Sequence, residues 1–525
     1  MTARTSRLLI AAIMFLAACQ SGGNVTCSLV GGTQLAPTTW PKFRADVANS
    51  GRAAVDLTMN DATGTLLFDG SCFAGATQTA QTCTVGVDGT CPADQTCARI
   101  GSISTTPILG PMQATEPSNV YLASSDGTVY VLNPLPLPTP GATPGPIQVT
   151  SAILGSPLLG ADGTLFVPSN GQLEQFLADG TPKNVAPLVG FAVAAPNIWP
   201  VDGTVFVATQ NGTLAAVCPN GVPRFAITGP GTDATSLVVQ DPHYNPTPGQ
   251  TPTLVAPIIV VGGVNGQVRA YTLNGNQYWS FSASANIVAA LMADLTTNLF
   301  YVADTAGRMV AVNLASGQAV PTFKFTTDEF APGQRPGIIA SPALGSDDAA
   351  VPTLYVADVG HFPERGGVLY ALDRASGEVR WRFPDPSEVA LEGPINSSPA
   401  VATGADKDVI VFAVDVLGAV DGSAVAIGGK VYAIQDDGDH ATLLPNFPFD
   451  AGHSIGSSSP AIGIDGRIYI GREGNCLRGA KDCVQDTTGC VGRACVVSEG
   501  GALYAIGPTP GTSMTPVPTA TPLPT

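Results

Sequence analysis

The sequence has little charge, and basic residues are especially few. Lys and Arg together number 23 against 40 Asp and Glu, so the formal net charge is −17. Proteins that bind nucleic acids need a basic surface to neutralise phosphates, and we therefore expect no nucleic-acid partner. The excess of carboxylates instead favours solubility.

The short motifs that bind metals, haem or phosphate are also missing. The sequence has no CxxCH haem site, no CxxC pair of the zinc-ribbon kind and no GxxxxGK(S/T) phosphate loop. GHSIG (452–456) has the form of a GxSxG nucleophile elbow, but it leads into a strand of small residues and no histidine follows it. The acidic run DDGDH (436–440) occupies a turn, where Asp is favoured for its backbone bonding. We therefore expect no metal site and no catalytic residue. The four histidines lack ligand spacing and are His243, His361, His440 and His453.

Long apolar runs are absent after the first twenty residues, so no later segment has the roughly 18 residues that span a bilayer. At the start, Arg4 and Arg7 precede an apolar run over 8–18, a layout typical of a secretory signal. The following LAAC resembles a bacterial lipobox, which implies that residues 1–18 are removed and that Cys19 is acylated. Gln20 then favours the outer membrane over the inner one. An ordinary secreted protein cut nearby is the alternative.

Ten cysteines remain after Cys19, an even number, and in an exported chain this predicts disulfides. Eight of them form two clusters: Cys72, Cys83, Cys91 and Cys97, then Cys476, Cys483, Cys490 and Cys495. We expect disulfides within or between the clusters, and their pairing cannot be deduced from spacing. Cys27 and Cys218 are left over, and a bond between them is a further option.

One phrase recurs along the chain and predicts the fold. VLYALDRASGEVRWRF (368–383) has degenerate copies such as QVRAYTLNGNQYWSF (267–281), and each copy reads as short apolar strands around a Gly turn. Four-stranded units of this kind bury both faces only when they stack around an axis. We therefore predict an all-β, eight-bladed propeller over 64–507, with seven blades as the alternative because the fourth and fifth repeats are the most degenerate. The first strands begin near Thr106, Ser156, Ala195, Ser236, Ala289, Ser341, Ser398 and Ser459.

The repeat resembles a known family. The order SPA(V/L/I), a YV strand, GxLYAL and WxF is similar to the pyrroloquinoline quinone (PQQ)-like repeat of quinoprotein dehydrogenases and of the outer-membrane β-barrel assembly lipoprotein. WPKFRADVANSGRA (40–53) is similar to the WPxFR lead-in that precedes such propellers. The resemblance implies a propeller strongly, but it specifies the chemistry only weakly.

The ends and insertions of the repeats predict where the chain is elaborated. We expect GTLLFDG (64–70) to close the ring as the outer strand of the last blade, beside ALYAIGP (502–508). Residues 19–63 form a tether and lead-in, and the Pro- and Thr-rich tail over 508–525 is expected to be disordered. Enlarged loops at 359–367 and 416–429, with Cys-rich insertions at 71–99 and 473–500, should gather on one rim. Candidate contact residues on that rim are His361, Phe362, Glu364, Arg365, Asp421, Arg472 and Arg478.

These observations favour a noncatalytic binding scaffold in the cell envelope, tethered to the outer membrane by lipid and facing either the periplasm or the cell surface. The expected partner is an envelope protein or a polysaccharide, and a surface adhesin is an alternative within this class. A PQQ-dependent dehydrogenase with PQQ and calcium is the enzyme alternative. The resemblance to quinoproteins would then imply adjacent cysteines and a Trp platform, but there is no Cys-Cys dipeptide. Trp279 and Trp381 take the WxF position, which leaves Trp40 and Trp199.

Overall fold

The computed structural model describes most of the repeat region. The described residues are Cys27 and residues 35–57, 63–68, 70–74, 77–83, 91, 93–113, 116–117, 119–132, 146–232, 236–239, 257–347, 351–403, 407–420, 423–473, 476–478, 495–497 and 501–507. Among them, no helix has the length and apolar character needed to cross a membrane.

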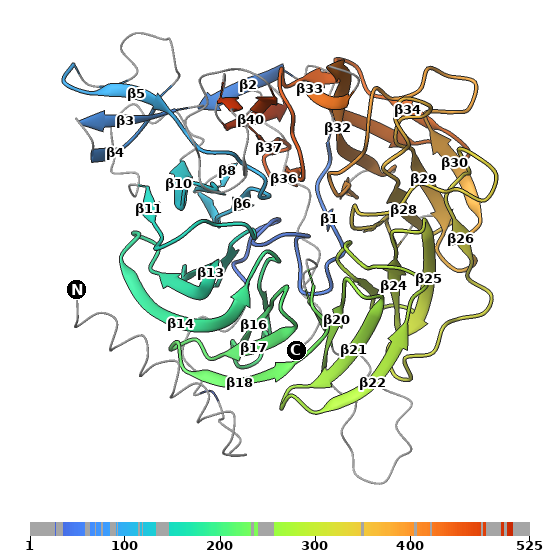
Figure 1. Cartoon of the computed structure of the whole chain (residues 1–525), viewed down its shortest axis with the longest axis horizontal. Coiled ribbons are helices and arrows are strands. Elements are labelled where there is room, and N and C mark those ends of the chain that lie inside the picture. Colours follow the sequence, from blue (N-terminus) through green and yellow to red (C-terminus); the bar gives the residue numbers. More distant parts are fainter. Residues whose placement is uncertain are drawn as a thin grey trace.

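Eight sheets stand around a common axis and form an eight-bladed propeller, as predicted (Figure 1). The first four blades, from the axis outward, are as follows. Blade 1 contains β6 (Ile108–Leu109), β9 (Val120–Ala123), β10 (Thr128–Leu132) and β11 (Ile147–Gln148). Blade 2 contains β12 (Leu158–Leu159), β13 (Leu165–Phe176) and β14 (Pro182–Phe191). Blade 3 contains β15 (Asn197–Ile198), β16 (Val205–Ala208), β17 (Thr213–Val217) and β18 (Pro223–Thr228). Blade 4 contains β19 (Leu237–Val239), β20 (Ile258–Gly262), β21 (Gln267–Thr272) and β22 (Gln277–Ser282).

The second half of the ring follows the same plan. Blade 5 contains β23 (Met292–Asp294), β24 (Leu299–Ala303), β25 (Arg308–Asn313) and β26 (Phe325–Thr326). Blade 6 contains β27 (Ala343–Leu344), β28 (Thr353–Ala357), β29 (Leu369–Asp373) and β30 (Val379–Phe383). Blade 7 contains β31 (Ala400–Ala402), β32 (Val409–Val420), β33 (Ser423–Asp436) and β34 (Ala441–Leu443), with β35 (Phe449–Asp450) also on β33 and β1 (Arg52–Ala53) on β31. Blade 8 contains β36 (Ala461–Ile462), β37 (Ile468–Arg472), β40 (Ala502–Gly507) and β2 (Thr63–Phe68).

The core lies between the blades, because each sheet packs both faces on its neighbours. The middle strands are therefore buried along their whole length, as in Thr353–Ala357, whereas the outer strand Gln277–Ser282 has no fully buried residue. One continuous apolar cluster joins blades 7, 8 and 1 through residues such as Val411, Tyr469 and Leu122. This burial on both faces explains why the second strand of each repeat reads as an unbroken apolar run.

The ring is closed by strands from the two ends of the propeller region. β2 pairs antiparallel with β40, with Leu66 opposite Tyr504 and Phe68 opposite Leu503. This confirms the predicted closing strand. Closure matters because an unpaired β40 would present a free edge to other chains.

The segment 416–429, predicted as an enlarged loop, is an extension of the sheet. β32 and β33 remain paired beyond the blade as far as Val420 opposite Ser423, so the insertion is a two-stranded ribbon. The β-branched residues on both sides of Gly418 favour this extended structure.

Serines before the recurrent prolines join successive blades. The backbone N–H of Ser341 in blade 6 donates to Ser398 Oγ in blade 7, and the N–H of Ser398 donates to Ser459 Oγ in blade 8, both at 2.9 Å. In the same way, the N–H of Ala290 donates to Ser341 Oγ and the N–H of Thr106 donates to Ser156 Oγ, again at 2.9 Å. The repeated serine therefore supplies an acceptor for a buried N–H that no strand partner reaches.

Candidate binding rim and propeller axis

Three insertions of blades 6 and 7 pack together on one rim. The loop over 359–367 meets the link between the two blades, where the Gly367 N–H donates to the Gly393 carbonyl at 2.8 Å. That link in turn meets the base of the β32–β33 ribbon, where the Leu417 N–H donates to the Glu392 carbonyl at 3.0 Å. The expected gathering of enlarged segments therefore holds for these two blades.

On this rim His361 and Glu364 are exposed. The His361 imidazole stacks on Phe330, with ring centroids 3.8 Å apart and an interplanar angle of 7°, and its Nε2 lies 3.7 Å from the Glu364 carboxylate. Phe362 is half-buried beside them. The stacking fixes an aromatic face and a carboxylate at the rim surface.

Two arginines expected to face a partner are turned into the protein. Arg365 forms an ion pair with the fully buried carboxylate of Asp358. Arg472 is only 5% exposed and donates to the Tyr504 hydroxyl at 2.9 Å. The expectation of an exposed Arg472 is therefore corrected: its guanidinium stabilises blade 8. Sequence patterns do not reveal this, because an Arg that ends an apolar strand has the same appearance whether it points in or out.

The cysteine clusters are described only in part. Cys19, Asp421, Cys483, Cys490 and His243 lie outside the described residues, as do the side chains of Cys72, Cys83, Cys476, Cys495 and Arg478. The first cluster forms a small separate sheet of β3 (Gly70–Ala74), β4 (Thr77–Cys83) and β5 (Thr96–Arg99), in which Cys72 is opposite Cys97. Cys91 and Cys97 are both disulfide-bonded. In the second cluster, β38 (Cys476–Arg478) pairs with β39 (Cys495–Val497). Two further short strands, β7 (Met112–Gln113) and β8 (Glu116–Pro117), pair with each other in a separate two-stranded sheet.

A disulfide joins Cys27 to Cys218, with the two Cα atoms 5.4 Å apart. The sequence had left a bond between these two cysteines open as an option, and the structure contains it. The bond fastens the N-terminal segment to blade 3, because Cys218 directly follows β17.

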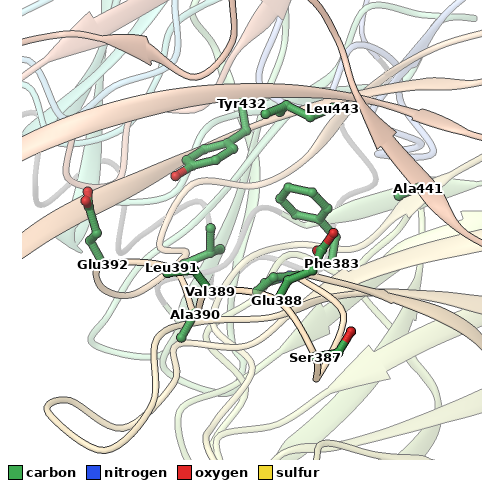
Figure 2. Close-up of a pocket in the computed structure, with 11 residues that line it drawn as sticks. Phe383, Ser387, Glu388, Val389, Ala390, Leu391, Glu392, Tyr432, Ala441 and Leu443 are labelled. Carbon is green, nitrogen blue, oxygen red and sulfur yellow. The ribbon is translucent and has the colours of Figure 1, made fainter.

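A hollow of about 540 Å³ opens between blades 6 and 7, next to the rim (Figure 2). Its floor is formed by Phe383, Leu391 and Tyr432, each 8% exposed, while Val389 beside them is 91% exposed. Leu443 adds an apolar wall from β34. Apolar concavities with a few polar groups are the usual form of a binding site.

The edge of the hollow is acidic. Asp385, Glu388 and Glu392 are exposed along the link, and Glu392 lies 2.5 Å from Lys430. Burial and the nearby Glu392 raise the pKa of the Tyr432 hydroxyl to about 12, so this hydroxyl is neutral. Figure 2 shows the hydroxyl and the Glu392 carboxylate on the same side of the hollow.

Two carboxylates, the buried Asp415 and the half-buried Glu473, lie where blade 7 meets blade 8. Asp415 Oδ1 accepts hydrogen bonds from the Ser454 hydroxyl and from the N–H groups of Ile455 and Gly456, at 2.9–3.0 Å. Burial, with a contribution from Asp415, raises the pKa of Glu473 to about 7. Ser454 is thus hydrogen-bonded to Asp415 as part of the loop that joins blades 7 and 8.

The axis of the propeller is occupied by the lead-in. Trp40 is 1% exposed, and the carbonyls of Trp40 and Pro41 accept from the N–H groups of Leu109 in blade 1 and Leu159 in blade 2. Further along, β1 pairs parallel with β31 of blade 7.

A family model described as outer membrane protein assembly factor BamB matches residues 194–329. These residues, well under half of the chain, are similar to that family's repeat. No curated protein matches the chain. Among solved structures, a europium-containing methanol dehydrogenase is 13% identical with a TM-score of 0.54, and the alignment covers 90% of this chain and 98% of that one. The quinohemoprotein alcohol dehydrogenase of Comamonas testosteroni is 11% identical with a TM-score of 0.53, covering 94% and 84%. BamB of Moraxella catarrhalis is 15% identical with a TM-score of 0.44, covering 78% and 98%.

At such low identity the likenesses to the two dehydrogenases show the propeller fold alone. The described residues show no open tryptophan platform for a quinone. Trp40 is buried within the lead-in and Trp199 is 7% exposed, so neither offers an open platform. Within the described ranges, no group of three or more His, Cys, Asp or Glu side chains could hold a metal ion.

Proposed function

We propose that this chain is a noncatalytic binding scaffold of the cell envelope, and that its contact surface is the rim of blades 6 and 7. The observation that carries the proposal is the apolar hollow between Phe383 and Tyr432, bordered by the exposed Val389. A side chain exposed to this degree beside an apolar floor gains free energy when a partner covers it.

The partner is a protein segment that carries apolar and basic side chains. Two exposed carboxylates, Glu388 and Glu392, line the hollow, and Lys430 is paired with Glu392. Such an edge attracts a basic segment, and it repels an acidic one. An apolar side chain of the segment then fills the space above Phe383.

The cellular setting follows from the N-terminus. Acylation of Cys19 would hold the propeller at the outer membrane, and the disulfide-bonded cysteines are consistent with an oxidising compartment. The description of the matching family model, an outer membrane assembly factor, supports the same location.

The test is crosslinking in envelope extracts with matched valine variants. Val389→Asp places a charge at the hollow, whereas Val201→Asp does the same at a turn of blade 3, where Val201 is 60% exposed. We expect crosslinked partners to be lost from Val389→Asp and retained by Val201→Asp. If both variants crosslink to the same partners, the hollow is not the contact surface.

The enzyme alternative has its own test. Dye-linked alcohol oxidation after addition of PQQ and calcium would contradict a noncatalytic role. The polysaccharide alternative is tested by passing the protein over immobilised envelope polysaccharide. If the unaltered protein is retained and Val389→Asp is retained less, the hollow binds a carbohydrate and the proposed protein partner is wrong.

A further inference from the structure

Residues 35–57, here called the axial strap, meet the innermost strand region of every blade. The contacts run once around the ring, beginning at blade 8, and none exceeds 3.3 Å. In blade order they are Thr39 Oγ1 to the Ile462 carbonyl, the Leu109 N–H to Trp40, the Leu159 N–H to Pro41, Asn197 Nδ2 to Val47, the Val238 N–H to Val47, the Ala293 N–H to Ala48, the Leu344 N–H to Ser50 and the Val401 N–H to Gly51.

In seven of these eight contacts, the strap supplies a backbone carbonyl as the acceptor. Six of the seven donors are backbone N–H groups of first strands, and the seventh is the side-chain amide of Asn197. In blade 7 the strap itself continues as β1 beside β31. Buried backbone donors need partners. The strap therefore acts toward the ring as an added strand acts toward a sheet edge.

The ring also binds a side chain of the strap. Arg44 is 1% exposed and donates to the carbonyls of Pro342 in blade 6 and Pro399 in blade 7. A buried cation without acceptors would be costly, so the Arg44 contacts fix one register for the strap on the ring. Lys42 is fully buried and instead holds the strap's own fold, because its Nζ donates to the carbonyls of Phe43 and Asp46 and to Asn49 Oδ1, at 2.6–2.9 Å.

The backbone of the strap is bent to match the ring. Arg44, Ala45 and Asn49 all have positive φ angles, of 67°, 65° and 55°. Such angles are rare outside glycine and persist where surrounding contacts enforce them. The strap is also fastened on both sides, by the Cys27–Cys218 disulfide before it and by β2 in blade 8 after it.

We propose that the centre of this propeller is a peptide-binding site and that its resident ligand is the axial strap. The ligand class is an extended peptide, held through its carbonyl oxygens by one donor from each of seven blades and through the buried guanidinium of Arg44. The site takes this peptide in place of a quinone or a metal. The inference is independent of the rim proposed above, because it involves no residue of the hollow.

The test releases the strap from its covalent connections after folding. A protease site is inserted at 58–62, between the strap and β2, in a full chain that carries Cys27→Ser and Cys218→Ser. After cleavage, we expect the fragment to elute with the propeller in gel filtration and to leave it only in denaturant, together with the loss of the β-sheet circular dichroism signal. Asn49→Ala, which removes contacts to Lys42 and to the Leu291 carbonyl, should release it at lower denaturant concentration.

Separation of the fragment from a propeller that keeps its spectrum and its melting temperature would overturn the proposal. If the altered chain does not fold, hydrogen exchange on the unaltered chain decides. The N–H groups of Leu109, Val238 and Val401 should exchange as slowly as those of central strands, at least 100-fold more slowly than exposed amides, on the order expected for locked core strands. Fast exchange at these positions, or stoichiometric binding of added PQQ with calcium to the intact chain, would refute a resident strap.

Discussion

Replacing Ser398 with alanine removes one acceptor from the hydrogen bonds that join blades 6, 7 and 8. Ser398 is 5% exposed, and its hydroxyl accepts the Ser341 N–H at 2.9 Å. Without the hydroxyl this buried N–H has no acceptor. Leaving a buried donor unsatisfied costs about 1–3 kcal/mol. The N–H of Ser398 keeps its own bond to Ser459, so the loss is confined to one link.

The assay is guanidinium unfolding followed by circular dichroism, with the disulfides intact. We expect the free energy of unfolding to fall by about 1–3 kcal/mol through a lower midpoint with an unchanged slope. Ser280→Ala, an exposed position on the outer strand β22, is the matched control. Ordinary surface substitutions change the free energy of unfolding by up to ~0.5 kcal/mol. If Ser398→Ala lowers the free energy of unfolding by no more than this, the serine links contribute nothing to stability.

Three further outcomes are expected. Cys27→Ser with Cys218→Ser should lower the unfolding free energy by about 2–4 kcal/mol, because the bond closes a separation of 191 residues, and an unchanged melting temperature would count against this. The pKa of Glu473 is raised to about 7, so the chain should lose up to about 3 kcal/mol as pH rises from 4.5 to 7. Glu473→Gln should abolish that part of the loss in unfolding curves at the two pH values, and an unaltered pH dependence would show that Glu473 is not its source. Gly360→Ala should displace the rim loop and lower the melting temperature, since Gly360 has a φ of 65° and an added Cβ would lie 2.3 Å from the Gly366 carbonyl carbon; an unchanged melting temperature would contradict this.

The ring itself could be predicted from sequence because its signal is local and repeated. Each unit carries its own apolar strands and glycine turn, so the copies imply eight blades or, if a degenerate repeat is discounted, seven. The unmatched TGTLLF strand implies closure with Ala502–Gly507. The long-range partner was predictable here because the last repeat lacks its fourth strand.

The strap and the hollow could not be derived in the same way. The strap binds mainly through backbone carbonyls, which every residue possesses, so its contacts leave little trace in side-chain pattern. The hollow is assembled from a link, β33 and β34, and none of these is apolar enough alone to indicate a site. The inward direction of Arg472 depends on Tyr504, which lies in another strand of blade 8.

The pairing of Thr63–Phe68 with Ala502–Gly507 has a consequence for biosynthesis. An early segment of the polypeptide must wait until the strand over 502–507 has been synthesised before it finds its partner. Until then the folding intermediate carries unpaired strand edges on both blade 8 and the early segment, and these edges favour aggregation. Productive folding of this protein should therefore depend on chaperones that cover those edges.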